Sequence, residues 1–236
     1  MQEQPSRKDV WKMFDQISKT YDQTNRVISL GLDTRWRKKA AMHLPKKNKL
    51  DLLDLAAGTG DQIFSIFEAH PNKEFSAIGI DLSKEMLRIA QEKLSRKNYK
   101  NQISFQEGDA QNIPFPQEKF DVVTMSFGIR NVMDLSQSFQ EMHRVLKKDG
   151  RALILEFSLP KFPVRPFHLF YLRRILPLIG QRMSKHQSAY RYLNETIETF
   201  PCGKAFSSLM KEAGFSKVDI HSLTLGTVNL YVAYKH

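Results

Sequence analysis

Short apolar runs alternate with amphipathic stretches through the middle of the chain. In the amphipathic stretches apolar residues recur at helical spacing, as Met86, Leu87, Ala90 and Leu94 do. This alternation predicts an α/β fold with a doubly wound, mostly parallel sheet and helices on both faces. The predicted strands are Leu50–Leu55, Phe75–Asp81, Ile103–Glu107, Phe120–Met125 and Arg151–Phe157. The predicted helices are Gln62–Ala69, Lys84–Lys97 and Leu135–Leu146.

The flanking segments add further elements to this core. They contain no repeat and no linker-like composition, so we expect a single domain over 1–236. Within it we expect an N-terminal helical cap at about 7–45 and a helical insertion after the fifth strand at about 158–198. The flanking helices are predicted at Arg7–Tyr21, Thr34–His43 and Gly203–Ala213, and two last strands at Lys217–Leu223 and Thr227–Tyr234, for a sheet of about seven strands.

Composition narrows the class of protein. Hydrophobic residues make up 41% of the 236 residues and charged residues 26%, which is typical of a globular chain. The single cysteine, Cys202, excludes an internal disulfide and fits a cytoplasmic location. No signal peptide opens the sequence, and no apolar run approaches the ~18 residues of a membrane-spanning helix. No histidine pair has metal-ligand spacing, so we predict no metal.

The first predicted strand ends in a glycine-containing turn that leads into a helix, and there the backbone must pass close to a ligand. The next strand ends in Asp81, about 20 residues past Gly60, which suits a ribose diol. A pyrophosphate loop would need a third glycine where Ile63 stands, and Asp54 and Asp61 would repel phosphate. S-adenosylmethionine fits better, because it has a ribose, an ammonium and a sulfonium but no phosphate. The alternative is an ordinary loop with incidental glycines.

Ligands of such sheets bind at the carboxyl ends of the strands. Asp109 is placed there to hold an adenine amino group, and Ala110 offers a backbone N–H. Asp109 could equally form a side-chain turn after Gly108. The strand-end rule nominates Gly58–Asp61, Asp81, Gly108–Ala110 and Ser126–Asn131.

A net charge of +11 implies an anionic partner, namely nucleic acid, an anionic membrane face or an acidic substrate. The alternative is that the proteins of the source organism are basic in general. From Ser158 to Asn194 the chain has no acidic residue. Basic and bulky apolar residues alternate there, as in an interfacial helix on an anionic membrane, or in a helical cap with a solvated basic face. The basic residues are Lys161, Arg165, Arg173, Arg174, Arg182, Lys185 and Arg191.

Several longer motifs occur from about Val10 to the C-terminus. They include Phe14-Asp15-Gln16-Ile17-Ser18, Tyr21-Asp22, Trp36-Arg37, Gly79-Ile80-Asp81-Leu82-Ser83, Phe127-Gly128-Ile129-Arg130-Asn131-Val132, Leu155-Glu156-Phe157-Ser158 and Tyr190-Arg191-Tyr192-Leu193. With them the chain resembles the menaquinone/ubiquinone biosynthesis C-methyltransferases (MenG/UbiE type). That resemblance implies a class I S-adenosylmethionine-dependent methyltransferase fold. The resemblance implies that Thr59, Asp81, Asp109, Ala110 and Ser126 contact the cofactor. We add Asp54, Gly58, Gly60 and Leu82 to the predicted cofactor-binding residues.

The resemblance also implies the reaction, which is methyl transfer to a ring carbon of a polyprenylated quinol. The acceptor would be most like demethylmenaquinol, with a 2-methoxy-6-polyprenyl-benzoquinol as the alternative. Its prenyl tail lies in a membrane, so the resemblance implies a cytoplasmic enzyme with peripheral contact to the inner, anionic face of the cell membrane. Lys148-Asp149-Gly150, Cys202 and Ala233 depart from the family pattern and leave the acceptor side open. A homodimer also stays open.

Methylation at carbon requires help, because a ring carbon is a weak nucleophile until the neighbouring hydroxyl loses its proton. Our hypothesis places Arg130 and Asn131 at this step. Arg130 would stabilise the quinolate oxygen or position a water, and Asn131 would orient the ring oxygen. Tyr21 and Asp22 would close over the site. The alternative for Arg130 is a surface ion pair with Asp134.

Three other functions compete with this one. Nucleic-acid amino-methylating enzymes carry an Asn/Asp-Pro-Pro-aromatic run where this chain has Ser126-Phe127-Gly128-Ile129, and Pro201-Cys202 lies far from the place of a nucleophilic cysteine. We therefore expect no nucleic-acid partner. A non-catalytic cofactor-binding scaffold and a methyltransferase for a soluble acceptor are the other two.

Overall fold

The computed structural model describes residues 7–183 and 187–236, and a seven-stranded sheet forms the centre of this described part. The strands are β1 (Lys49–Leu55), β2 (Glu74–Asp81), β3 (Ile103–Glu107), β4 (Phe120–Ser126), β5 (Leu146–Phe157), β6 (Lys217–Leu223) and β7 (Val228–Tyr234). Their order is β3-β2-β1-β4-β5-β7-β6, with β1 to β5 parallel and β7 antiparallel to both its neighbours. The predicted doubly wound sheet of about seven strands is confirmed.

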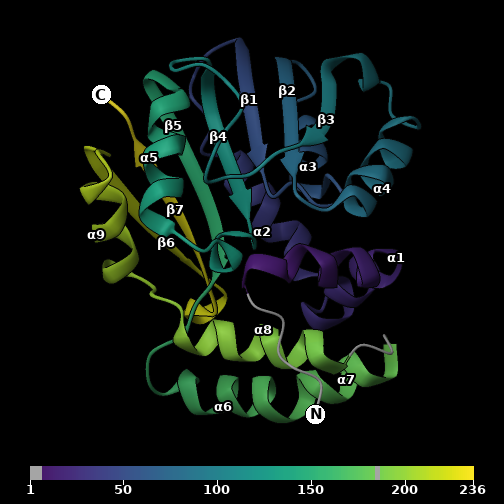
Figure 1. Cartoon of the computed structure of the whole chain (residues 1–236). Helices are drawn as coiled ribbons and strands as arrows, with labels where there is room; N and C mark the ends of the chain where they lie inside the picture. The colour runs from purple at the N-terminus through teal and green to yellow at the C-terminus, as the bar shows by residue number, and fades with distance from the viewer. Residues whose placement is uncertain (1–6, 184–186) are drawn as a thin grey trace.

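Helices cover both faces of this sheet (Figure 1). Successive side chains of a strand point to opposite faces. Thus Leu52 of β1 joins the core under α2, α3 and α4, whereas Leu53 joins the core under α5 and α9. Burial on both faces explains why the parallel strands are almost continuously apolar. The helices on the sheet are α2 (Leu32–Ala41), α3 (Asp61–Ala69), α4 (Lys84–Leu94), α5 (Leu135–Val145) and α9 (Lys204–Glu212).

A helical layer lies below the carboxyl ends of the parallel strands (Figure 1). It consists of α1 (Val10–Ile28), α6 (Val164–Phe170), α7 (Leu176–Met183) and α8 (Gln187–Thr199), and a π-helical turn at Tyr171–Ile175 joins α6 to α7. Val10 and Met13 of α1 share a third core with Leu172, Leu176 and Tyr192. The helix α2 was expected in the cap but packs on the sheet through Trp36 and Ala40.

The largest differences in length from the prediction occur in α1, α4 and β5. The helix α1 continues past Tyr21 to Ile28, because Thr24 prolongs its buried face, and it ends before Gly31 with a φ of +75°. The helix α4 ends at Leu94. The strand β5 begins at Leu146 rather than Arg151, because the pairing of β4 with β5 continues past a register irregularity to Leu146.

The described residues contain no helix that is both long and apolar enough to cross a membrane.

Candidate active site

A cleft of about 430 Å³ opens at the carboxyl ends of β1, β2 and β4 and is roofed by α1. Its volume lies in the range of roughly 300–1,000 Å³ that is usual for small-molecule sites. Many predicted residues line it together, although they are far apart in sequence. Those residues are Tyr21, Gly58, Asp81, Leu82, Asp109, Ala110, Ser126 and Asn131.

The loop after β1 keeps its backbone close to this cleft. Gly58 and Gly60 have φ values of +55° and +84°, which favour glycine. A Cβ on Gly60 would lie 2.9 Å from the rings of Phe64 and Phe105, so a larger residue there would push the loop off α3. Backbone conformation and packing therefore explain both glycines, and a phosphate ligand is not needed to explain them.

Asp81 is held at the cleft by two backbone donors. The N–H groups of Gly58 and Ser83 donate to its two carboxylate oxygens, each at 2.8 Å. Burial raises the pKa of Asp81, and these two hydrogen bonds oppose that rise. A carboxylate fixed in this way at the end of β2 is suited to accept hydrogen bonds from the two hydroxyls of a ribose.

Asp109 and Ser126 also reach the cleft, and each has a partner inside the protein. The N–H of Gln111 donates to Asp109 at 2.9 Å, so the side-chain turn forms and Asp109 still lines the cleft. The hydroxyl of Ser126 donates to Gln62 at 2.8 Å. Gln62, on α3, was not predicted as a site residue, and it fixes Ser126 from behind.

Asp54 lies beneath the loop, and it does not line the cleft. Its side chain is 1% exposed and accepts a hydrogen bond from the Thr124 hydroxyl of β4. Burial raises the pKa of Asp54 to about 7, against the opposing effects of Thr124 and Arg37. Asp54 is therefore placed to act on a ligand through the loop, and its direct contact with the cofactor stays a prediction.

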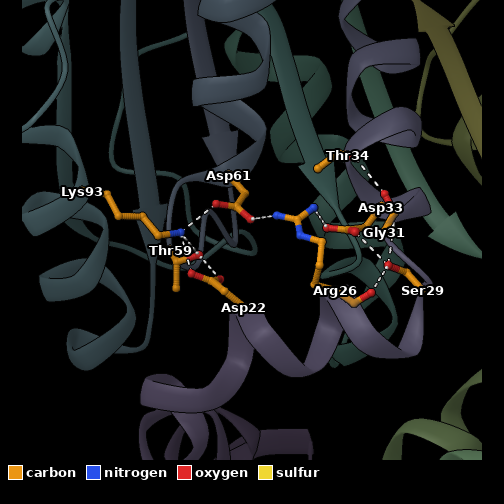
Figure 2. A network of polar contacts seen from close by, with 9 residues as sticks. All are labelled: Asp22, Arg26, Ser29, Gly31, Asp33, Thr34, Thr59, Asp61 and Lys93. Atoms are coloured by element: carbon orange, nitrogen blue, oxygen red, sulfur yellow. Dashed lines mark hydrogen bonds and ion pairs between the residues drawn. The ribbon is translucent and has the colours of Figure 1, made fainter.

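Thr59, Asp22 and the side-chain end of Lys93 form a polar network on the far side of the same loop (Figure 2). The Thr59 hydroxyl donates to Asp22 at 2.7 Å, and the Lys93 ammonium contacts Asp22 at 2.6 Å and Asp61 at 2.7 Å. Burial would raise the pKa of Asp61, but Lys93, Arg37 and Arg26 together lower it. The network ties α1 to the loop and to α4.

The network involves or borders three predicted site residues, whose roles stay predictions. Neither Thr59 nor Gly60 lines the cleft, and Thr59 is 2% exposed. Asp22 also lies outside the cleft, because its carboxylate turns toward Lys93 (Figure 2). There it docks α1 onto the loop, and its predicted closing over the site stays a prediction. Lys93 gave no sequence signal, since a lysine on an amphipathic helix is ordinarily solvated.

A smaller inner pocket of about 60 Å³ lies beside the cleft and under α1. Phe14, Tyr21 and Phe127 line both spaces, so the two share a wall. Its remaining walls come from segments that are distant in sequence. They include Met13, Ile17 and Asn25 of α1, Trp36 and Arg37 of α2, Arg130, Phe157, and Ala189, Tyr192 and Leu193 of α8.

Arg130 lines the inner pocket as half of a buried ion pair. It is 5% exposed, and its Nη1 donates to Glu156 at 2.6 Å and to the Phe127 carbonyl at 2.7 Å. Its guanidinium also lies 5.3 Å from the centre of the Phe157 ring. The alternative of a surface pair with Asp134 is therefore wrong. Glu156 was not predicted as a site residue, although a glutamate inside an otherwise apolar strand is a signal for such a partner.

Two tyrosine hydroxyls reach the boundary between the pockets. Tyr192 donates to the Asn131 side-chain oxygen at 3.2 Å, so Asn131 touches the cleft and the inner-pocket wall at once. Burial raises the pKa of Tyr192 and of Tyr21, and Arg130 opposes both rises. Both hydroxyls therefore stay protonated at neutral pH, where they donate hydrogen bonds and are poor bases.

An apolar groove of about 210 Å³ continues outward from the inner pocket. Ile28, Trp36, Phe157 and Leu193 line both spaces. The groove reaches the surface at Leu30, which is 81% exposed. Tyr171, Leu172 and Leu176 of the predicted insertion form its outer wall, with Thr224 and Thr227 opposite.

The predicted basic–apolar segment carries several exposed apolar side chains. Phe162, Phe167, Phe170 and Leu178 are exposed by 61–86%. Arg173 is paired with Glu198, at 2.9 Å, so this cation is balanced by an acid from outside the acid-free stretch. Lys185 and the side chain of Arg182 lie outside the described part of the chain. Within residues 7–183 and 187–236 no cluster of three His, Cys, Asp or Glu side chains could hold a metal.

Comparison with known sequences gives one family. The sequence model of the ubiE/COQ5 methyltransferase family matches residues 1–235. The demethylmenaquinone methyltransferase of Chlorobaculum parvum is 42% identical over 98% of this chain and 94% of its own length. The demethylmenaquinone methyltransferase of Bacteroides fragilis is 39% identical over 96% of this chain and 92% of its own length. The ubiquinone/menaquinone biosynthesis C-methyltransferase UbiE of Geotalea daltonii is 40% identical over 96% of both chains.

Comparison with solved structures concerns the fold. An S-adenosylmethionine-dependent methyltransferase of Thermotoga maritima has a TM-score of 0.67 at 17% identity, covering 96% of this chain and 100% of its own. Phosphoethanolamine N-methyltransferase 2 of Haemonchus contortus, in complex with S-adenosyl-L-methionine, has a TM-score of 0.59 at 16% identity, over 81% and 50%. At these identities the likeness shows the fold alone, and it confirms the predicted class I methyltransferase fold.

Proposed function

The chain belongs to the ubiE/COQ5 methyltransferase family, and on this premise we propose that it methylates a ring carbon of a polyprenylated quinol, demethylmenaquinol in the first place. It is an S-adenosylmethionine-dependent C-methyltransferase. One observation supports the assignment of the acceptor site above all. The cleft and the inner pocket share Tyr21 and Phe127 as a wall, so a methyl donor in one lies next to an aromatic ring in the other.

The cleft fits S-adenosylmethionine, which supplies the methyl group. Asp81 would accept hydrogen bonds from the ribose hydroxyls. Two backbone N–H groups already hold its carboxylate oxygens in place at the end of β2. Asp109 and the backbone N–H of Ala110 would hold the adenine edge.

The acceptor ring would lie in the inner pocket between Phe127, Phe157 and Trp36. Aromatic walls hold a flat ring in a fixed orientation, and fixed orientation can supply several kcal/mol of the barrier, up to about 7–11 kcal/mol in the best cases. The protonated hydroxyl of Tyr21 can donate to the ring oxygen nearest the methyl donor. Asn131, oriented by Tyr192, can hold the same oxygen from the other side.

The inner pocket must widen before it admits such a ring. A cavity of about 150 Å³ is needed to hold benzene, and the inner pocket has about 60 Å³. Its roof is α1, which touches the body of the protein through the polar network of Asp22, Thr59 and Lys93. We therefore propose that α1 or α8 moves outward when the acceptor binds.

The prenyl tail would leave the ring through the apolar groove. The groove begins at the inner pocket and reaches the surface at Leu30, which is 81% exposed. Exposed phenylalanines and the cations Arg165 and Arg174 lie on the neighbouring insertion. A surface of this kind suits peripheral contact with an anionic membrane, where cations meet headgroups and aromatic rings enter the interface.

The decisive assay offers short-chain demethylmenaquinol and a demethylated benzoquinol side by side, both kept reduced, with labelled S-adenosylmethionine. We expect methylation of the naphthoquinol. Methylation of both would mean an enzyme that serves two pathways. If neither is methylated while the cofactor still binds, the assignment of the acceptor fails, and nucleic acid and soluble phenols are the next acceptors to test.

Flotation with vesicles of anionic lipid tests the membrane contact. Arg165→Glu with Arg174→Glu should reduce the bound fraction, since each cation near such a surface contributes about 1 kcal/mol. Lys100→Glu, an exposed lysine that precedes β3, is the matched control and should leave the bound fraction close to that of the unaltered protein. Equal binding of all variants would refute the contact through the insertion.

A further inference from the structure

Arg37 is a buried cation without a direct partner among the described residues. Its side chain lies on α2 and is 9% exposed, yet its guanidinium makes no hydrogen bond or ion pair with any described residue. Its Nε is buried and unsatisfied, and the guanidinium rests 5.3 Å from the centre of the Phe127 ring. A buried donor left without a hydrogen-bond partner is costly unless a ligand completes it.

The neighbouring carboxylates do not supply that partner. Asp61 already contacts Lys93 at 2.7 Å and Arg26 at 3.8 Å. Asp54 has a pKa raised by burial to about 7, so it carries only part of a charge at neutral pH. Asp33, which also lines the inner pocket, contacts Arg26 at 2.7 Å.

The two arginines of the inner pocket therefore differ in net charge. Arg130 is neutralised by Glu156 at 2.6 Å, whereas Arg37 keeps its positive charge. Both arginines act on the Tyr21 hydroxyl, lowering a pKa that burial raises, and Arg37 has the larger effect. The titratable and charged groups that line this space are Tyr21, Asp33, Arg37, Arg130 and Tyr192. Glu156 acts on it through Arg130, and Asp22, Asp54 and Asp61 act from outside its lining.

We propose that Arg37 is a catalytic residue that binds the anionic oxygen of the deprotonated acceptor, with Tyr21 as its hydrogen-bonding companion. The inference rests on the proposed function, because it names the positive charge that stabilises the quinolate oxygen in the inner pocket. Arg130 then becomes a positioning residue, locked by Glu156 and the Phe127 carbonyl. This changes the role that the sequence suggested for Arg130.

The chemistry balances without a further reactant. The quinol hydroxyl releases its proton to solvent, and Arg37 holds the oxygen anion that remains. The ring carbon next to that oxygen uses a ring electron pair to form the new carbon–carbon bond, while the methyl–sulfur bond breaks and sulfur keeps the bonding pair. The same ring carbon then loses its hydrogen as a proton, and the aromatic ring is restored.

A different ligand for Arg37 would be the carboxylate of the methyl donor. The walls of the two spaces favour the acceptor, because Arg37 lines the inner pocket and not the cofactor cleft. It also lines a polar recess on the far side of the Thr59 loop, with Lys93 and Arg26. The affinity for S-adenosylmethionine therefore separates the two assignments.

The test compares Arg37→Met and Arg37→Lys with Arg35→Met, an exposed arginine of the same helix. The turnover number is measured against pH with short-chain demethylmenaquinol, and the affinity for S-adenosylmethionine by calorimetry. A nearby opposite charge lowers the pKa of an acid by about 1–3 units. In Arg37→Met the acidic limb of the pH profile should move up by that amount, with turnover recovered at high pH. Arg37→Lys and Arg35→Met should keep the limb near its original place.

Binding of the 2-hydroxy-1,4-naphthoquinone anion provides a readout that needs no methyl transfer. Arg37→Met should weaken this binding by about tenfold or more, equivalent to about 1.4 kcal/mol.

If the unaltered enzyme binds the anion but methylates no quinol, the proposed function fails and the site of Arg37 stands. If quinol is methylated and the limb does not move, or turnover falls equally at every pH, the role of Arg37 is refuted. Loss of cofactor affinity alone assigns Arg37 to the donor carboxylate instead. Should Arg37→Met not fold, Arg37→Gln serves for the same comparison.

Discussion

The cofactor cleft and the inner pocket adjoin each other but are built in different ways. The cleft is made at strand ends, where backbone N–H groups of Gly58 and Ser83 fix Asp81. The inner pocket is made by side chains from α1, α2, β5 and α8, and its polar core is the Arg130–Glu156 pair. The first depends on local turn geometry, and the second on how distant segments meet.

This difference suggests how the two spaces divide the work. A cleft fixed by backbone can bind one invariant cosubstrate with little change of shape. A pocket roofed by α1 and α8 can open for a bulky ring and close behind it. The wall of Phe14, Tyr21 and Phe127 is shared by the two spaces, and Phe14 and Tyr21 both lie on α1.

The largest effect should come from breaking the buried pair of the inner pocket. Glu156→Ala leaves the Arg130 charge buried without its partner, which should lower the free energy of unfolding by about 3–5 kcal/mol. Urea denaturation at neutral pH measures this change. Glu85→Ala, which breaks the exposed pair with Arg88, is the control, and it should change stability by less than about 1 kcal/mol. Similar losses in both variants would mean that the buried pair stabilises the fold no more than an exposed pair does.

The next effect concerns Asp54, the buried carboxylate under the cofactor loop. Its pKa is 3.8 in the unfolded chain and about 7 in the folded protein. Between these two pH values the folded state therefore keeps a proton that the unfolded chain has lost. Its contribution to stability is therefore full below pH 3.8 and is lost as the pH rises to about 7. The loss amounts to at most about 4 kcal/mol.

Asp54→Asn removes this titration. Subtracting its stability curve from that of the unaltered protein between acidic and neutral pH should give a difference that falls as the pH rises. A flat difference would show that Asp54 has an ordinary pKa and that the loop rests on a charged group.

A smaller, selective effect is expected at the cleft. Asp81→Ala removes the ribose acceptor and the anchor of the Gly58 N–H, which should weaken binding of S-adenosylmethionine by about 3 kcal/mol, or roughly a hundredfold. Binding of the 2-hydroxy-1,4-naphthoquinone anion should stay the same, because Asp81 does not line the inner pocket. Calorimetry with each ligand measures both. Parallel weakening of the two would mean that the spaces are not independent.

Local patterns predicted the parts of the molecule that local physics controls. The apolar run of β1, the glycine turn and Asp81 at the end of β2 were all visible in the sequence, because strand ends of a parallel sheet converge. The motif placed Thr59 next to the cofactor but could not give the direction of its hydroxyl. That direction depends on α1, which runs seven residues past Tyr21 and brings Asp22 to the loop.

Arg37 and Glu156 show the limit most clearly. Both lie in the motifs that carry the family resemblance, yet neither was a candidate site residue. The role proposed for Arg37 depends on its Nε having no hydrogen-bond partner among the described residues, which is a property of the packed structure alone. The sequence pointed to Arg130, which follows β4 directly, but only the fold shows that Glu156 neutralises it.

The most direct measurement is a crystal structure with S-adenosylhomocysteine and a short-chain demethylmenaquinone bound together. The account predicts the ribose on Asp81, the quinone ring between Phe127 and Phe157 with an oxygen facing Arg37 and Tyr21, and the tail in the groove toward Leu30. A ring bound anywhere else, or a cofactor whose sulfur faces away from Tyr21 and Phe127, would contradict it.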